Sequence, residues 1–68
     1  MENRMYQIYH MSNLGSGFVY GEDGDYGTVV NPDNAREFAR MRECKLVVQD
    51  CAKRWRIPVE RFRIFRKT

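Results

Sequence analysis

The sequence predicts one small α+β domain, residues 1–68, with the element order βββαβ. Three observations predict this fold. Short β-prone runs in the first half are separated by glycine-rich turns, a helix-start signal follows them, and an apolar stripe at helical spacing precedes a last β-prone run. The expected architecture is a three-stranded antiparallel meander, one long or kinked helix packed on the sheet, and a closing C-terminal strand.

The meander is predicted from three runs and the turns between them. Residues 5–10 are rich in aromatic and β-branched side chains, and residues 18–20 and 28–30 form shorter runs of the same kind. Glycine and small polar residues fill the intervening segments, 12–17 and 21–27. Short strands joined by such turns are typical of antiparallel hairpins.

A helical region is predicted from about residue 32 to residue 55. Asn31 is a favoured N-cap residue, and Pro32 suits the first helical position. The clearest apolar stripe lies in the later part of this region and consists of Cys44, Val47, Val48, Cys51 and Trp55.

An earlier stripe, formed by Ala35, Phe38 and Ala39, is out of phase with the later one. We therefore expect a short helix over residues 32–39, a break near 40–42 and a longer helix over 43–55. A single bent helix is the alternative.

The closing strand is predicted after Pro58, because the residue before a proline avoids the helical conformation. It spans residues 60–67, with Phe62 and Ile64 directed toward the core. The opposite side of the strand then carries Arg61, Arg63 and Phe65.

Charge is distributed unevenly along the chain. The formal net charge is +3, but residues 1–34 hold one base and five acids, whereas residues 35–68 hold eleven bases and four acids. A basic half of this kind favours an acidic partner.

The candidate binding residues lie where basic and aromatic side chains interleave, between residues 53 and 67. Arginine and aromatic residues are enriched among the residues that dominate binding energy at interfaces. The predicted partner-binding residues are Arg54, Arg56, Arg61, Arg63, Phe65, Arg66 and Lys67. Two other interpretations stay open: a solvated basic rim, and a nucleic-acid interface to which the strand Gly17–Tyr20 adds stacking aromatics.

The sequence offers little for catalysis or metal binding. His10 is the single histidine, and no sequence rule pairs it with a nucleophile. Cys44 and Cys51 would lie about 10.5 Å apart along a helix, whereas a disulfide needs Cα atoms within roughly 7 Å. We therefore expect two reduced, buried cysteines, no catalytic residue, no metal and no cofactor.

No apolar run approaches the ~20 residues of a membrane span. The N-terminal residues 1–5 also lack the apolar segment of a signal peptide. The expected location is therefore the cytoplasm.

The order of elements, with Asn31-Pro32-Asp33 opening an Ala35-Arg36-Glu37-Phe38 helix, resembles small accessory proteins encoded by bacteriophages and prophages. The resemblance is one of pattern over most of the chain and transfers no site residues. It implies a non-enzymatic protein in the cytoplasm of a bacterial host, often one that binds and inhibits a host protein.

The expected function is therefore that of a phage-encoded inhibitor or adaptor, which docks on an acidic surface of a host protein through its C-terminal arginine and aromatic face. The alternative is a small nucleic-acid-binding module that uses the same basic face. A homodimer is a further alternative partner arrangement, because a chain this small can complete its core by dimerising.

Overall fold

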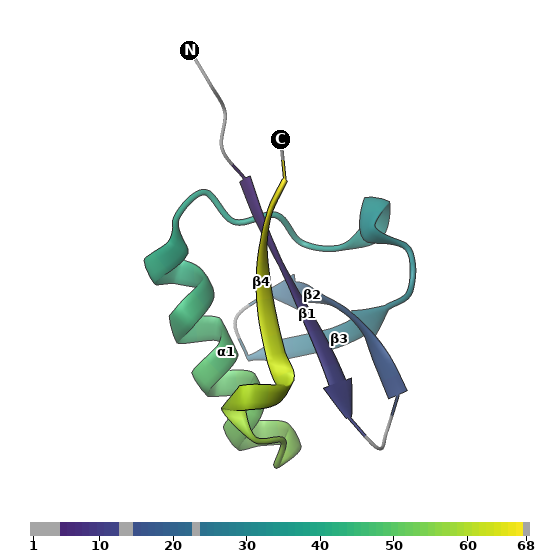
Figure 1. The fold of residues 1–68 in the computed structure, drawn as a ribbon, viewed down its shortest axis with the longest axis vertical. Coiled ribbons are helices and arrows are strands. Elements are labelled where there is room, and N and C mark those ends of the chain that lie inside the picture. Colours follow the sequence, from purple (N-terminus) through teal and green to yellow (C-terminus); the bar gives the residue numbers. More distant parts are fainter. Residues whose placement is uncertain (1–4, 13–14, 23, 68) are drawn as a thin grey trace.

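In the described part of the chain, one sheet and one α-helix form the fold (Figure 1). The computed structural model describes residues 5–12, 15–22 and 24–67. Within these residues the elements are β1 (Met5–Ser12), β2 (Gly15–Glu22), β3 (Asp25–Val29), the 3-10 turn η1 (Pro32–Asn34), α1 (Met41–Trp55), the 3-10 turn η2 (Val59–Arg61) and β4 (Phe62–Lys67). The strand order is β3-β2-β1-β4 with antiparallel neighbours throughout, which confirms the predicted βββαβ fold.

The hairpins extend further than the sequence predicted. Gly17 and Gly27, expected in turns, lie within β2 and β3. Close approach favours glycine at both positions, by a backbone carbonyl at Gly17 and by an exposed side chain at Gly27. A Cβ on Gly27 would lie 2.5 Å from the ring of Tyr20, and a Cβ on Gly17 would lie 2.8 Å from the carbonyl oxygen of Val29. Glycine inside a strand commonly marks such a contact rather than a turn.

The predicted helix over residues 32–39 is wrong. The start signal itself operates: Asn31 Oδ1 accepts the N–H of Asp33 at 2.9 Å, and Pro32 begins a helical turn. That turn is η1, a single turn of 3-10 helix. It ends at Ala35, whose backbone is extended with φ −79° and ψ 153°.

The α-helix begins at Met41, inside the break predicted near residues 40–42. It ends at Trp55. The helical region is therefore 41–55 and not 32–55, and the idea of one bent helix across the whole region is also wrong.

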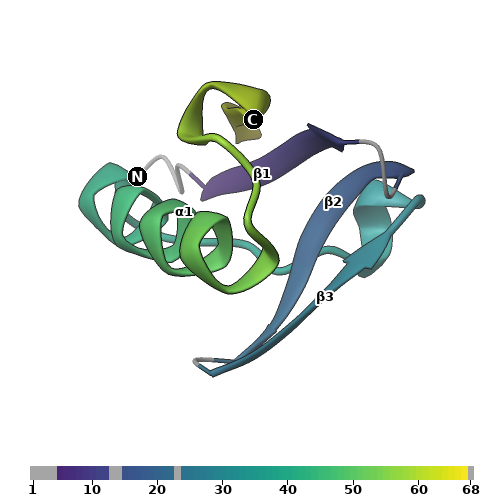
Figure 2. The same cartoon turned by 90° about the horizontal axis from the view of Figure 1, so that it is seen from below.

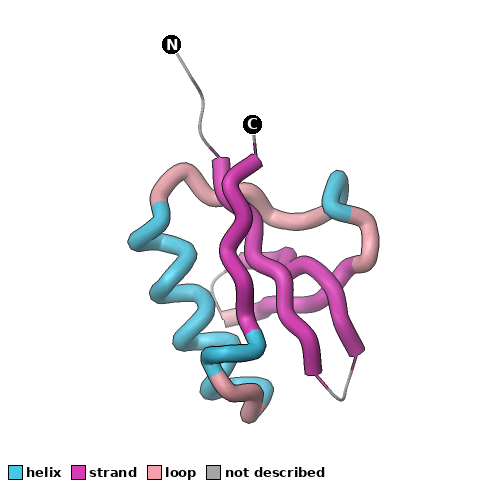
Figure 3. The backbone as a smooth tube through the Cα atoms, viewed as in Figure 1, coloured by secondary structure: helices cyan, strands magenta, loops and turns pink. Residues whose placement is uncertain are grey.

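The segment between η1 and α1 is extended because it fills an opening in the sheet. Among the described residues, β1 pairs with β2 only over Tyr9–Ser12, so the first half of β1 has no described strand on that side. Phe38 occupies this place: it exchanges two backbone hydrogen bonds with Tyr6, both 2.8 Å long. On the other side of the opening, the N–H of Arg36 donates to the carbonyl of Val19 at 3.1 Å. Figure 3 shows this connection passing beside β1 before it reaches α1.

The core lies between α1 and the sheet face that it covers (Figure 2). The apolar stripe predicted for the helix is buried there, and Trp55 is partly buried at the helix end. Phe38 joins the core from the extended connection. The buried apolar side chains are Ile8, Val19, Phe38, Cys44, Val47, Val48, Cys51, Ala52, Ile57 and Phe62.

Cys44 and Cys51 are both unbonded thiols with no exposed surface, as predicted. Burial raises the pKa of Cys44 to about 11 and the pKa of Cys51 to about 12. Because the thiolate is the reactive form, both side chains are inert in the folded protein.

We expect iodoacetamide to modify neither cysteine at an appreciable rate near pH 8, and to modify both rapidly in denaturant. Leu46→Cys is the matched control, because residue 46 lies on the exposed side of the same helix. It should be alkylated in the folded protein. A folded-protein mass that lacks two hydrogens, or fast native alkylation of the parent, would contradict the buried placement on α1.

The helix stripe also predicts a difference in stability between two neighbouring positions. Val48→Ala removes buried methyl groups and should lower the free energy of unfolding by about 1–3 kcal/mol. Leu46→Ala, at a side chain that is 63% exposed, should change it far less. Urea unfolding followed by circular dichroism measures both. Equal losses would show that the buried face of α1 is assigned wrongly.

Candidate binding surface

The sheet face turned away from α1 carries three aromatic rings in a row. Phe18 on β2 is the register partner of Tyr9 on β1, and Phe65 on β4 pairs with the nearby Gln7. The ring centroids of Tyr9 and Phe18 are 5.0 Å apart, and those of Tyr9 and Phe65 are 6.4 Å apart; both pairs meet edge to face. We call this sheet face the outer face, and Phe18, Tyr9 and Phe65 the aromatic row. The row ends at Phe65, whose side chain is 50% exposed.

Arg63 lies beside the aromatic row. It pairs with Tyr9 across β1 and β4, so the two side chains project from the same face. Its Nη1 donates to the carbonyl oxygens of Glu60 at 2.6 Å and Phe62 at 3.0 Å. A guanidinium has five N–H donors, so this anchoring leaves others for an incoming acceptor.

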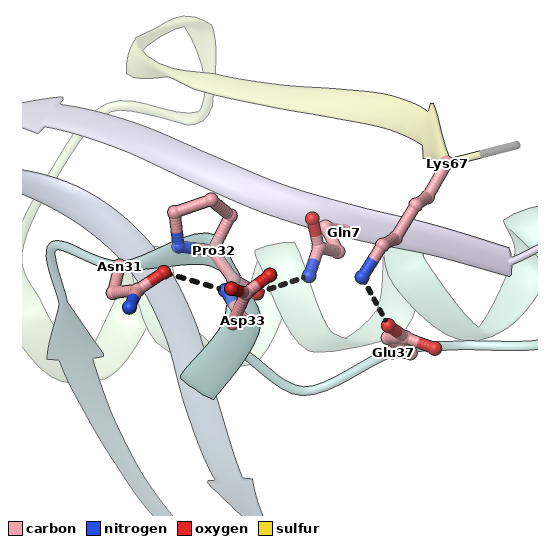
Figure 4. Close-up of polar contacts among 6 residues, drawn as sticks. All are labelled: Gln7, Asn31, Pro32, Asp33, Glu37 and Lys67. Atoms are coloured by element: carbon pink, nitrogen blue, oxygen red, sulfur yellow. Dashed lines mark hydrogen bonds and ion pairs between the residues drawn. The ribbon is translucent and has the colours of Figure 1, made fainter.

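The segment that follows β3 covers the outer face near Gln7 and Lys67 (Figure 4). The buried amide of Gln7 donates through Nε2 to the carbonyl of Pro32 at 2.7 Å. At the end of β4, Lys67 Nζ contacts Glu37 Oε2, also at 2.7 Å, and this bond raises the pKa of Lys67. Both partners are exposed, so the ion pair adds little to stability. Lys67 lies on the outer face, as the alternation of β4 requires, but its ammonium group is paired with Glu37 in the segment between η1 and α1.

Two of the predicted binding residues, Arg54 and Arg56, lie at the end of α1. Arg54 forms an ion pair with Asp50 one turn earlier, with Nε and Oδ1 3.0 Å apart. Arg56 is the helix C-cap, in the left-handed conformation with φ 56°. Neither residue belongs to β4 or to its outer face.

The other two, Arg61 and Arg66, are also separated from Arg63. Arg61 ends η2, so the strand alternation that was expected to place it beside Arg63 does not reach it. Arg66 has the parity of the buried Phe62 and therefore projects from the opposite face of β4. Of the seven predicted residues, the structure brings together Arg63, Phe65 and Lys67.

Tyr9 is the residue of this surface that the sequence analysis did not assign to it, and Phe18 was assigned only under the nucleic-acid interpretation. The alternation of β1 already separates Tyr9 from Ile8 and His10. What it does not indicate is that β4 returns beside β1, which is what places Phe65 next to Tyr9.

His10 lies on the inner face of the sheet, almost fully buried. Its Nε2 is 2.8 Å from Oγ1 of Thr28, and its ring centroid is 5.2 Å from that of Trp55 and 5.7 Å from that of Phe62. Its Nδ1 has no hydrogen-bond partner among the described residues. The bonded partner is a hydroxyl and not a carboxylate that would stabilise an imidazolium. This geometry is that of a neutral core histidine, and burial lowers its pKa.

In the described part of the chain, no three or more histidine, cysteine, aspartate or glutamate side chains are grouped to hold a metal ion. The helix in residues 24–67 is also too short and too polar to cross a membrane. Comparisons with protein-family models, curated proteins and solved structures found no match to this chain.

The burial of His10 predicts a loss of stability on acidification. Its pKa in the folded protein is lower than the ordinary value of 6.5, so the unfolded chain takes up the proton first as the pH falls. The stabilising effect of neutral His10 is therefore complete above about pH 6.5 and declines below it. Urea unfolding at about pH 7.5 and about pH 5 measures this loss.

His10→Gln is the control, because glutamine can bond to Thr28 and does not titrate. Its stability should fall less between the two pH values than that of the parent. An equal fall in both proteins would assign the acid sensitivity to other groups.

Proposed function

We propose that this protein acts by binding and not by catalysis, and that it docks on an acidic surface of another protein through Arg63 and the aromatic row. The observation that carries this proposal is the position of Arg63 beside the half-exposed Phe65 on the outer face. In its fullest form, the proposal is that of a phage-encoded inhibitor or adaptor that acts on a host protein in the bacterial cytoplasm.

The outer face is suited to this role because its contact groups are held before a partner arrives. The rings of the aromatic row support one another across three strands, and two carbonyl oxygens hold Arg63 Nη1. A preorganised side chain loses less conformational entropy on binding. The remaining donors of the guanidinium match a carboxylate, which is the acceptor that an acidic protein surface offers.

The second candidate is a nucleic-acid-binding module on the same face. Exposed aromatic rings on an open sheet, next to an arginine, are typical of surfaces on which unpaired bases stack. The other end of the outer face opposes this function, because Glu22 and Asp25 are register partners there and would repel a phosphate backbone that extends along the face, whereas a protein can present its carboxylates at Arg63 alone. A protein partner is therefore the better match.

Charge reversal at Arg63 tests the proposal. The tagged parent protein should recover one protein from nuclease-treated bacterial lysate, and Arg63→Glu should reduce its recovery at least ten-fold, since like charges at an interface cost several kcal/mol. Phe65→Ala should also reduce recovery, through loss of the exposed ring. Lys53→Glu is the matched control, because Lys53 is exposed on α1, away from this face, and its reversal should leave recovery unchanged.

Circular dichroism of each variant verifies that the fold is intact. If Arg63→Glu and Phe65→Ala leave recovery unchanged, the partner binds to another surface of the protein. Recovery that disappears on nuclease treatment, with an affinity that falls steeply with salt, would support the nucleic-acid function instead.

A further inference from the structure

β4 is an edge strand of the sheet, with β1 on one side and no described strand on the other. Residues of β4 and α1 line one groove, so part of this strand lies close to the helix. An unpaired edge of this kind is a template for another strand.

The register identifies which backbone groups this edge presents. Both the N–H and the C=O of Tyr6 bond to Phe38, on the side of β1 away from β4. Tyr6 and its register partner Arg66 therefore form a non-hydrogen-bonded pair. The N–H and C=O of Arg66 point away from β1, toward the edge of the sheet. Ile64, two residues earlier, has the same orientation. At Phe62 the N–H is already used by Val59, so the open edge consists of Ile64 and Arg66.

A groove runs beside this edge, between β4 and α1. It has a volume of about 370 Å³. Its apolar residues are Val48, Val59, Phe62 and Ile64, and its polar residues are Lys45, Gln49 and Arg63. Val59, at 50% exposure, leaves an apolar wall open to solvent. The groove thus combines backbone hydrogen-bonding groups, an apolar floor and cationic residues along one short stretch.

We propose that the edge of β4 and this groove bind an extended acidic segment of the partner protein, which adds to the sheet as a further strand. This inference rests on the proposed function, because it takes the acidic protein partner from there and assigns how that partner is recognised. Main-chain hydrogen bonds to Ile64 and Arg66 would supply affinity, and the groove would select side chains.

The alternation of a strand specifies the character of this segment. Side chains on the inner face of an added strand point toward the groove and its wall residue Val59, which favours apolar residues there. Side chains on the outer face of the added strand lie next to Arg63 and Phe65, where carboxylates of the segment can bind the guanidinium of Arg63. The expected segment therefore alternates apolar and acidic residues.

Charge favours an acidic segment at β4 over the other possible strand additions. The residues of β4 include no acid, and Lys45 of α1 adds a cation to the groove. At the opposite edge of the sheet, β3 carries Asp25, and the cavity near it is lined in part by Glu43 and Asp50, so an acidic segment is repelled. Pairing of two β4 strands from two copies would bring arginines of both chains together, which is destabilising.

The test uses a pool of blocked synthetic peptides of about seven residues, the length of an ordinary strand, in which glutamate alternates with valine, isoleucine, leucine or phenylalanine. Nuclear magnetic resonance of the ¹⁵N-labelled protein should show shifts and slowed exchange at the amides of Ile64 and Arg66. A matched pool with lysine in place of glutamate should not produce them.

The decisive variants are Arg66→Pro and Arg66→Ala. Both remove the same side chain, but only proline also removes the N–H at the open edge, and no bond to β1 is lost because that N–H faces away from β1. Arg66→Pro should bind the glutamate peptides about ten-fold more weakly than Arg66→Ala, which corresponds to the loss of a backbone hydrogen bond.

Equal affinities of the two variants, or equal binding of the glutamate and lysine pools, would overturn the strand addition. So would self-association of the free protein through these amides, or their protection by a short single-stranded oligonucleotide. If the peptides fail while Arg63→Glu still abolishes capture of the partner protein, the further inference falls and the proposed function stands. If Arg63→Glu has no effect on capture, the proposed function itself falls.

Discussion

The paired hydrogen bonds between Tyr6 and Phe38 are the interaction on which the rest of the structure depends. Among the described residues, β2 pairs with β1 only from Tyr9 to Ser12. Without another partner, the first half of β1 would keep unpaired backbone groups next to the core. Such groups are costly when they are removed from water. The extended connection satisfies them, and the same segment places the ring of Phe38, 1% exposed, in the core. It also sets where α1 begins and therefore where the helix lies against the sheet.

This pairing makes the two sides of the β1–β4 pair unequal. On one side, β1 is closed by β2 and by Phe38; on the other side, β4 has no neighbouring strand among the described residues. The return of β4 beside β1 also completes the aromatic row, because it brings Phe65 to Tyr9. The outer face with Arg63 and the open edge at Ile64 therefore belong to the same short strand. A partner that bound both would contact one continuous surface.

Local patterns predicted the parts of this fold that are determined locally. The helical stripe from Cys44 onward and the alternation of Phe62 and Ile64 need only periodicity, and both are confirmed. The helix over 32–39 was predicted from a genuine start signal at Asn31, but a tertiary need overrode it: the open side of β1 required an extended partner. That need arises from strand pairing, which periodicity does not reveal.

The candidate binding surface was predictable to the same extent and for the same reason. Phe65 and Arg63 were placed on one side of a strand correctly, because alternation within a strand is local. Arg61 was placed with them wrongly, because the 3-10 turn before β4 interrupts that alternation. Tyr9 joins them only through the pairing of β4 with β1.

Hydrogen exchange of the backbone amides in the free protein, read by nuclear magnetic resonance, tests the central claim most directly. The account predicts that the amides of Tyr6 and Phe38 exchange only on global unfolding, with the slowest amides of the core, while those of Ile64 and Arg66 exchange rapidly. Rapid exchange at Tyr6 and Phe38, together with strong protection at Ile64 and Arg66, would contradict it. That result would mean that β1 is the open side of the sheet and β4 the closed one.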